Sequence, residues 1–288
     1  MTSNPAIFEK AILGSSDYDE QLEELARTGA PARAIYQEIA IQDVQEAADV
    51  LRSVYDELQG ADGFVSLEVD PDLAFDTDRT LTQAREYWER VSRPNAMIKI
   101  PATPAGLPAI EQAIYEGINV NVTLLFSVEA YTTVIEAYIV GLERRRTEGL
   151  SLDVRSVASF FVSRVDSEVN ERLQALGRSD LAGQAAVANA RAAYHRFEEI
   201  FRGERFTALA DAGAPVQRPL WASTGVKNPA MRRRSTSRSS SVLTPSARCR
   251  WRRCWRAPTA CTSRARPSAR TRRRLSRRWP RPGSTWTT

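Results

Sequence analysis

Residues 96–127 read AMIKIPATPAGLPAIEQAIYEGINVNVTLLFS, and this stretch holds two apolar runs with a helical pattern between them. The runs, 96–103 and 118–127, are apolar on both faces, which is typical of parallel strands that helices cover. The intervening pattern ends at Gly117, a residue type that commonly stops a helix. The stretch therefore predicts a strand–helix–strand unit with parallel strands.

Similar units recur about every 30 residues along the first 230 positions. Further apolar runs that predict strands are 63–69, 154–163 and 219–224. Further helices are expected after an Asp76 cap, after a Ser127 cap, over 181–201, and as a pair within 18–60 that divides near 28–32.

A doubly wound sheet and a closed barrel both fit this α/β order. Polar residues favour the TIM-type barrel, because they lie toward the carboxyl ends of successive strands, where barrel enzymes collect catalytic groups. These residues are Glu68, Thr103, Thr123, Ser159 and Ser223. No Gly-rich phosphate loop follows a strand, which argues against a nucleotide site.

Lysine is scarce in this chain, and one lysine lies in an apolar strand. Of 40 basic residues only Lys10, Lys99 and Lys227 are lysine, and Lys99 stands between Ile98 and Ile100. A buried lysine can lose its proton near neutral pH, which arginine cannot, and a Schiff-base nucleophile needs that property. The alternative is an edge-strand lysine that reaches solvent. Lys10 is expected only to solvate the first helix.

The net charge of +5 averages two unlike parts of the chain. Residues 231–288 hold 18 arginines and no acidic residue, which leaves 22 basic residues against 35 acidic ones in residues 1–230, a net charge of −13. The acidic part gives no reason to expect nucleic-acid binding.

Metal, cofactor and membrane sites are not expected. All three cysteines (Cys249, Cys254 and Cys261) lie after residue 230, and their spacing matches no zinc site. His195, the only histidine, lies in a helical pattern and is expected at the surface. No leader segment and no apolar run of membrane-spanning length is present, so a cytoplasmic protein is expected.

Six segments in order resemble transaldolase of the long, actinobacterial type. They are TSNPAIFEKAI (2–12), VSLEVDPDLAFDT (65–77), MIKIPAT (97–103), GINVNVTLLFS (117–127), SFFVSR (159–164) and WASTGVKNPA (221–230). The resemblance implies a class I aldolase on a TIM-type (β/α)8 barrel, a transferase of carbohydrate metabolism in the pentose phosphate pathway. Such an enzyme moves a dihydroxyacetone unit from sedoheptulose 7-phosphate or fructose 6-phosphate to an aldose phosphate, without a cofactor.

The resemblance also assigns catalytic roles by position. Lys99 matches the lysine whose imine with the ketose serves as electron sink for C–C cleavage. Glu68 and Thr123 match the pair that holds the catalytic water during imine formation. The structural alternative for Glu68 is a solvated carboxylate at a strand end.

Substrate-binding roles follow in the same way. Three residues match groups that bind the dihydroxyacetone unit, and three match the phosphate site, where cations and a hydroxyl bind a dianion. The first set is Asn4, Asn121 and Ser159, and the second is Arg164, Ser223 and Lys227. The structural alternatives are caps for the asparagines and a satisfied core hydroxyl for Ser159.

Both ends of the chain depart from the family pattern. The family has a helix and a strand before TSNP, and that strand supplies an acid/base aspartate that matches no residue here. We therefore expect an incomplete barrel, with the strand 1 and strand 8 regions missing or replaced. Lys99 is then expected in a cavity exposed to water, and the chain is expected to have little or no activity.

Residues 1–230 are expected to form the barrel, and residues 231–288 an Arg/Ser-rich tail. The tail is either a natural disordered segment that binds nucleic acid or a frame-shifted translation of a GC-rich gene. The frameshift is favoured because the tail replaces the segment that should close the barrel, and an open barrel leaves unpaired strand edges.

Two other functions remain open. A fructose 6-phosphate aldolase-like enzyme would release free dihydroxyacetone, but those relatives are shorter and lack insertions such as residues 18–60. A protein that binds nucleic acid through its basic tail is opposed by the acidic residues 1–230. Sugar phosphates are the expected partners, and the sequence leaves the preferred ketose and the oligomeric state open.

Overall fold

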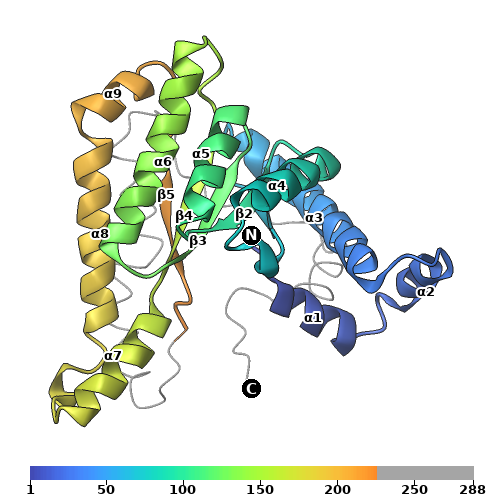
Figure 1. Ribbon diagram of the computed structural model, residues 1–288, viewed down its shortest axis with the longest axis horizontal. Coiled ribbons are helices and arrows are strands. Elements are labelled where there is room, and N and C mark those ends of the chain that lie inside the picture. The colour runs from blue at the N-terminus through green and yellow to red at the C-terminus, as the bar shows by residue number, and fades with distance from the viewer. Residues whose placement is uncertain (226–288) are drawn as a thin grey trace. The chain divides into compact units, whose positions relative to one another are not determined.

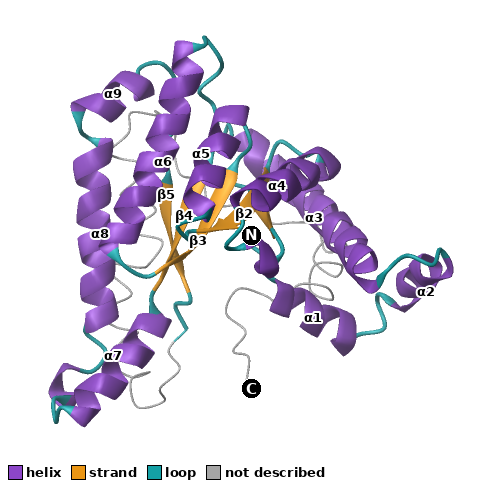
Figure 2. Ribbon diagram, viewed as in Figure 1, coloured by secondary structure: helices purple, strands orange, loops and turns teal. Residues whose placement is uncertain are grey.

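The computed structural model describes residues 1–225, and Figure 1 labels the helices and strands of this part of the chain. The described strands are β1 Val65–Glu68, β2 Ala96–Pro101, β3 Val120–Leu125, β4 Ser156–Phe161 and β5 Arg218–Ala222. Each lies on one of the predicted apolar runs, so all five strand predictions are confirmed. The strands are the orange segments of Figure 2.

Helices connect these strands. They are α1 Pro5–Gly14, α2 Asp19–Arg27, α3 Ala32–Glu57, α4 Thr77–Val91, α5 Gly106–Glu116, α6 Val128–Thr147, α7 Ser163–Ala175, α8 Ala185–Phe201 and α9 Glu204–Ala210, with short 3-10 turns at Pro71–Leu73 and Ser179–Leu181. The pair predicted within residues 18–60 is α2 and α3, and α7 and α9 were not predicted. The strand–helix repeat is that of part of a (β/α)8 barrel, so the predicted fold class is confirmed.

The predicted helix boundaries have the expected capping geometry. Asp76 Oδ1 accepts a hydrogen bond from the Arg79 N–H at 3.0 Å, and Ser127 Oγ accepts one from the Ala130 N–H at 3.2 Å. Gly117 ends α5 with φ at 88°, a left-handed conformation that favours glycine. Local sequence chemistry therefore sets where α4, α5 and α6 begin or end.

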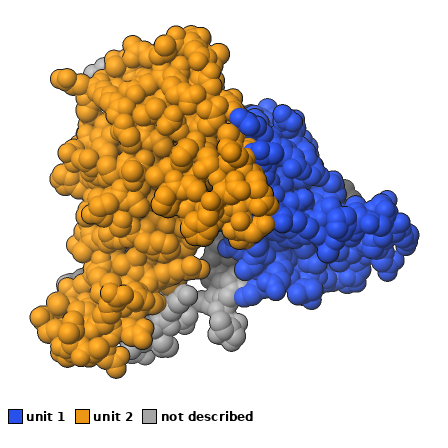
Figure 3. All heavy atoms as spheres, in the orientation of Figure 1, with its two compact units in different colours: residues 1–70, 82–99, 262–288 blue, residues 71–81, 100–261 orange. Residues whose placement is uncertain are grey.

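The chain divides into two compact units, drawn in different colours in Figure 3. Among the described residues, the first unit comprises 1–70 and 82–99. In it, β1 and β2 pair in parallel, and α3 packs against β1. Thr2 forms a parallel bridge with Ser66, so the first residues of the chain lie along the edge of β1 that β2 leaves free.

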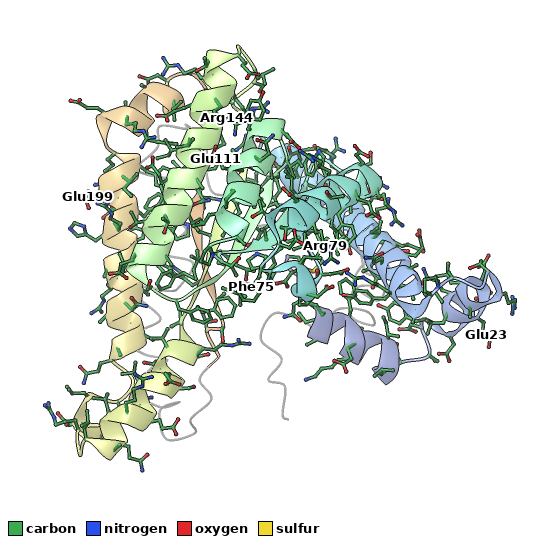
Figure 4. All side chains as sticks on the ribbon, viewed as in Figure 1. Glu23, Phe75, Arg79, Glu111, Arg144 and Glu199 are labelled. Carbon is green, nitrogen blue, oxygen red and sulfur yellow. The ribbon has the colours of Figure 1, made fainter. Side chains whose placement is uncertain are left out.

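The second unit comprises 71–81 and 100–225. In it, β4 pairs in parallel with both β3 and β5. Helices α5 and α6 pack together, and Figure 4 labels Arg144 and Glu111, whose side chains form an ion pair of 3.0 Å between these helices. The pairing of β3 with β4 shifts register between Val122 and Leu125, where Leu124 has φ at 64°. This irregularity lies directly after Thr123.

The predicted tail, residues 231–288, lies outside the described residues, as does Lys227. The domain boundary at residue 230 therefore stays a prediction. None of the helices in residues 1–225 combines the length and the apolar character that crossing a membrane requires.

Candidate active site

Lys99 and Glu68 form an ion pair in the first unit. The parallel register of β1 and β2 aligns Glu68 with Lys99, and Nζ lies 2.8 Å from Glu68 Oε2. Their side chains are 9% and 16% exposed, respectively, so little water screens the pair. A nearly buried amine with a carboxylate at hydrogen-bonding distance is an arrangement in which the carboxylate can take the ammonium proton.

Residues at the start of the chain cover this lysine. Lys99 Nζ also donates to the Ser3 carbonyl at 3.3 Å, and Ser3 Oγ donates to the Ser66 carbonyl at 2.7 Å. Lys99 as a whole is 7% exposed. The expectation of a water-exposed Lys99 was therefore wrong, because the segment 1–3 lies along β1 and supplies a carbonyl to the ammonium group.

Asn4 lies next to this segment, at the start of α1. Its Oδ1 accepts a hydrogen bond from the Ile7 N–H at 2.9 Å, which is the geometry of an N-cap. The structural alternative for Asn4 is thus observed, and a role in substrate binding has to involve the remaining polar atoms of the side chain.

Asn121 and Ser159 contact each other in the second unit. Ser159 Oγ donates to Asn121 Oδ1 at 2.8 Å across β3 and β4, and the two residues are 2% and 1% exposed, respectively. Two buried polar groups that share a hydrogen bond hold each other in one orientation. The structure therefore brings together two of the three residues that were assigned to the dihydroxyacetone unit.

Thr123 has a buried hydroxyl that forms no hydrogen bond within residues 1–225. The residue is 1% exposed, and among the described residues its Oγ1 has no hydrogen-bond partner. Its carbonyl accepts a hydrogen bond from the Ala102 N–H at 2.8 Å. Since a buried hydroxyl without a partner costs about 1–3 kcal/mol, Thr123 Oγ1 is suited to a ligand or a water molecule.

Ser223 and Arg164 lie near the N-terminus of α7. Ser223 Oγ is 2.8 Å from Ser163 Oγ, and the Ser163 N–H donates to the Ser223 carbonyl at 2.7 Å. Arg164 is exposed, and its guanidinium carbon lies 5.3 Å from the centre of the Phe161 ring. A helix N-terminus with a cation and hydroxyls has the chemistry of an anion site. Lys227, the third predicted member, is not among the described residues.

Tyr36 and Asp70 belong to the surroundings of Glu68, and neither was predicted from the sequence. Burial raises the pKa of Tyr36 to about 12, with smaller contributions from the charges of Asp70 and Glu68. Asp70 accepts a hydrogen bond from Gln83 Nε2 at 2.8 Å. The available signal was the position of Asp70, an acidic residue directly after the predicted strand 63–69 and two positions after Glu68.

The single histidine and the possible metal ligands of residues 1–225 lie apart from one another. His195 is exposed, as predicted. Within this range, no three residues among the histidines, cysteines, aspartates and glutamates lie close enough to hold a metal ion.

Comparison with known proteins identifies one family. The family model for transaldolase and fructose-6-phosphate aldolase matches residues 1–236. The chain is 54% identical over 231 residues to the transaldolase of Saccharopolyspora erythraea, a match that covers 80% of this chain and 63% of that protein. It is 56% identical over 234 residues to transaldolase 1 of Streptomyces avermitilis, covering 80% and 62% respectively. The chain thus spans less than two thirds of the length of these relatives.

Proposed function

The chain belongs to the transaldolase/fructose-6-phosphate aldolase family, and from this membership we propose that it transfers a dihydroxyacetone unit between sugar phosphates through a Schiff base at Lys99. The reaction is that of sedoheptulose 7-phosphate with glyceraldehyde 3-phosphate, which gives erythrose 4-phosphate and fructose 6-phosphate in the pentose phosphate pathway. The nearly buried ion pair between Lys99 and Glu68 is the observation that carries the proposal.

Imine formation begins with the ion pair. Glu68 accepts a proton from the ammonium group of Lys99, which lies 2.8 Å away, and the free amine adds to the ketose carbonyl. The carbinolamine hydroxyl then leaves as water after it gains a proton, and a protonated imine joins the ketose to Nζ. The Thr123 hydroxyl, which lacks a partner in the described part of the chain, is suited to hold the water that carries these protons.

Cleavage uses the imine as electron sink. The bond between C3 and C4 of the ketose, one bond away from the imine carbon, breaks; its electron pair forms the C=C bond of an enamine on Lys99 while the C=N pair moves onto nitrogen, and the aldose phosphate leaves. Addition of the enamine to a second aldose phosphate and hydrolysis of the imine complete the transfer. The hydroxyl proton released on cleavage goes to a base that the family resemblance assigns to an aspartate, for which this sequence offers no matching residue.

The substrate is proposed to contact two groups of residues. Asn121 and Ser159, which already share a hydrogen bond of 2.8 Å, hold the hydroxyls of the dihydroxyacetone unit, together with Asn4. The phosphate binds at the N-terminus of α7. Its proposed ligands are Arg164, Ser223 and Lys227.

Cytoplasmic localisation is part of this proposal, since the substrates are cytoplasmic metabolites in this pathway. Transfer is preferred over simple aldol cleavage because the compared relatives of 54–56% identity carry the name transaldolase. The family model covers both activities, so the experiment has to separate them.

A two-substrate assay tests the proposal. The chain is incubated with fructose 6-phosphate, with and without erythrose 4-phosphate, and the products are measured by mass spectrometry. Transfer predicts sedoheptulose 7-phosphate only when both substrates are present, at a rate that we expect to be far below that of the full-length relatives. Free dihydroxyacetone from fructose 6-phosphate alone would identify an aldolase instead, and failure to form either product or any adduct at Lys99 would overturn the proposal.

A further inference from the structure

A second carboxylate lies just beyond the catalytic strand in the first unit. Asp70 follows the end of β1 and is only 7% exposed. Its Oδ2 accepts hydrogen bonds from Arg33 Nε at 2.9 Å, Gln37 Nε2 at 3.0 Å and Gln83 Nε2 at 2.8 Å. The Tyr87 hydroxyl lies 3.3 Å from Oδ1. Side chains from two helices, α3 and α4, therefore hold one carboxylate at the end of the strand.

This carboxylate is linked to the active site through the backbone. Asp70 lies two positions after Glu68, and the intervening Val69 donates its N–H to the carbonyl of Lys99 at 3.0 Å. The Asp70 N–H itself donates to Gln83 Oε1 at 2.7 Å. Because β1 has only four residues, these bonds are the restraints closest to Glu68 on the C-terminal side of the strand.

Tyr36 lies in the surroundings of these carboxylates. Its ring packs edge-on against Phe8, with 5.9 Å between ring centres. Burial, with smaller contributions from the charges of Asp70 and Glu68, raises the pKa of Tyr36 to about 12, so the hydroxyl stays protonated at neutral pH.

The charges around the two carboxylates balance in pairs. The groups involved are the carboxylates of Asp70 and Glu68, the cations of Arg33 and Lys99, and the neutral hydroxyls of Tyr36 and Tyr87. Arg33 neutralises Asp70, which leaves Glu68 to pair with Lys99.

We propose that Asp70 is a positioning residue that holds Glu68 against Lys99 through the end of β1. This inference rests on the proposed function, because it gives the network a role in keeping the Schiff-base lysine paired until a ketose binds. Asp70 itself does not contact the substrate. It determines how firmly Glu68 stays at the Lys99 ammonium group.

Competitive labelling of lysines tests this without any sugar. The full chain is treated with a trace of acetic anhydride, which acylates free amines, and mass spectrometry measures the acetylation of Lys99 relative to exposed Lys10 on α1. In Asp70→Asn, we expect the Lys99 to Lys10 ratio to rise by roughly 3- to 10-fold, because Glu68 is held less firmly and the ammonium is released more often. Glu68→Gln should raise the ratio at least as much.

Asp43→Asn is the matched control. Asp43 is another buried carboxylate of the first unit, is 2% exposed, and accepts a hydrogen bond of 2.6 Å from the Tyr18 hydroxyl. Its replacement removes a buried carboxylate–tyrosine bond on the same helix α3, so a general loosening of the unit would affect both variants alike. We expect the labelling ratio of Asp43→Asn to stay within about 1.5-fold of the unsubstituted chain.

Equal labelling ratios in Asp70→Asn and Asp43→Asn, both unchanged or both raised, would overturn the proposal. Where circular dichroism shows that Asp70→Asn does not fold, Gln83→Leu replaces it, since this variant keeps Asp70 and removes the hydrogen bonds of Gln83 to its Oδ2 and its N–H. A raised ratio in Gln83→Leu then supports the proposal and an unchanged ratio overturns it. Since no sugar is used, the outcome is independent of whether the chain transfers dihydroxyacetone.

Discussion

Two buried hydroxyls of the candidate site, those of Ser159 and Thr123, differ in whether they form a hydrogen bond within residues 1–225. Ser159 Oγ has a partner in Asn121 at 2.8 Å, whereas Thr123 Oγ1 has none among residues 1–225. A hydrogen bond between buried groups stabilises a fold by about 0.5–1.5 kcal/mol, and an unsatisfied buried group lowers stability. We therefore expect that replacement of Thr123 impairs function without lowering stability, whereas replacement of Ser159 lowers both.

Replacement of each hydroxyl tests this difference. Ser159→Ala should lower the free energy of unfolding by about 1–2 kcal/mol, because Asn121 loses a donor. Thr123→Val keeps the shape of the side chain and should leave stability unchanged or raise it by up to about 1 kcal/mol, while it slows imine formation. Urea denaturation followed by tryptophan fluorescence measures both, and a loss of stability in Thr123→Val equal to that in Ser159→Ala would contradict the assignment.

The titration of the Tyr36 hydroxyl makes the free energy of unfolding depend on pH in the alkaline range. Its pKa is raised from the ordinary value of 10.0 to about 12 in the folded chain, chiefly by burial. Between these values the folded state keeps the proton that the unfolded state has lost, so the free energy of unfolding falls as the pH rises from about 10 to 12. Below pH 10 both states hold the proton and this contribution is constant.

Tyr36→Phe removes this titration. Its free energy of unfolding should fall less steeply between pH 10 and 12 than that of the unsubstituted chain, as measured by urea denaturation at a series of pH values. Tyr55→Phe is the control, because it also removes a phenol from the first unit, where the Tyr55 ring packs edge-on against Phe64 with 5.3 Å between ring centres. Identical slopes for Tyr36→Phe and the unsubstituted chain would show that Tyr36 is not protected by burial.

At the scale of elements, the helix pair α5 and α6 depends on one close approach. A Cβ atom on Gly141 of α6 would lie 2.9 Å from the Glu111 carbonyl and 2.9 Å from Ile114 Cγ2, both on α5. These distances are shorter than ordinary van der Waals contacts, so the glycine permits the two helices to pack. The ion pair of Arg144 with Glu111 lies in the same helix pair.

Gly141→Ala should therefore destabilise the fold, although alanine favours helices. Overpacking in a tight contact costs about 1–3 kcal/mol, which exceeds the gain of about 1 kcal/mol from helix propensity. Gly14→Ala is the control, since Gly14 ends helix α1 and has no atom within 4 Å of the new Cβ position. Thermal unfolding should show a lower Tm only for Gly141→Ala, and a Tm that rises in both variants would contradict the close approach.

Sequence patterns predicted the elements that carry a strong local signal. The five strands and the caps at Asp76, Ser127 and Gly117 follow from apolar runs and capping chemistry. Helix α7 escaped prediction for a physical reason. Among its residues only Ser163 is buried, so the helix has no apolar stripe that a periodicity could reveal.

Long-range contacts set the limit of prediction for the candidate site. The chemical role of Lys99 could be inferred from its place in the strand and from the family resemblance, but its burial could not. That burial depends on Ser3, whose hydroxyl bonds to a residue 63 positions away, and no local pattern encodes this pairing. The network around Asp70 joins helices α3 and α4 in the same way.

At the scale of the whole molecule, charge is distributed unevenly. Residues 231–288 carry 18 arginines and no acidic residue, beside a net charge of −13 in residues 1–230. If the tail is a frame-shifted translation, the nucleotide sequence around codon 230 should encode an acidic and apolar continuation in another reading frame. Sequencing of that region decides this, and three frames without such a continuation would favour a natural basic tail.

The central claim is that Lys99 forms a Schiff base with a ketose phosphate. The most direct measurement is reduction with borohydride in the presence of fructose 6-phosphate, followed by peptide mass spectrometry, which is unambiguous here because the chain has only three lysines. We predict a reduced adduct on Lys99, none on Lys10 or Lys227, and none in Lys99→Arg. The absence of an adduct on Lys99, or equal modification of Lys10 and Lys99, would contradict the account.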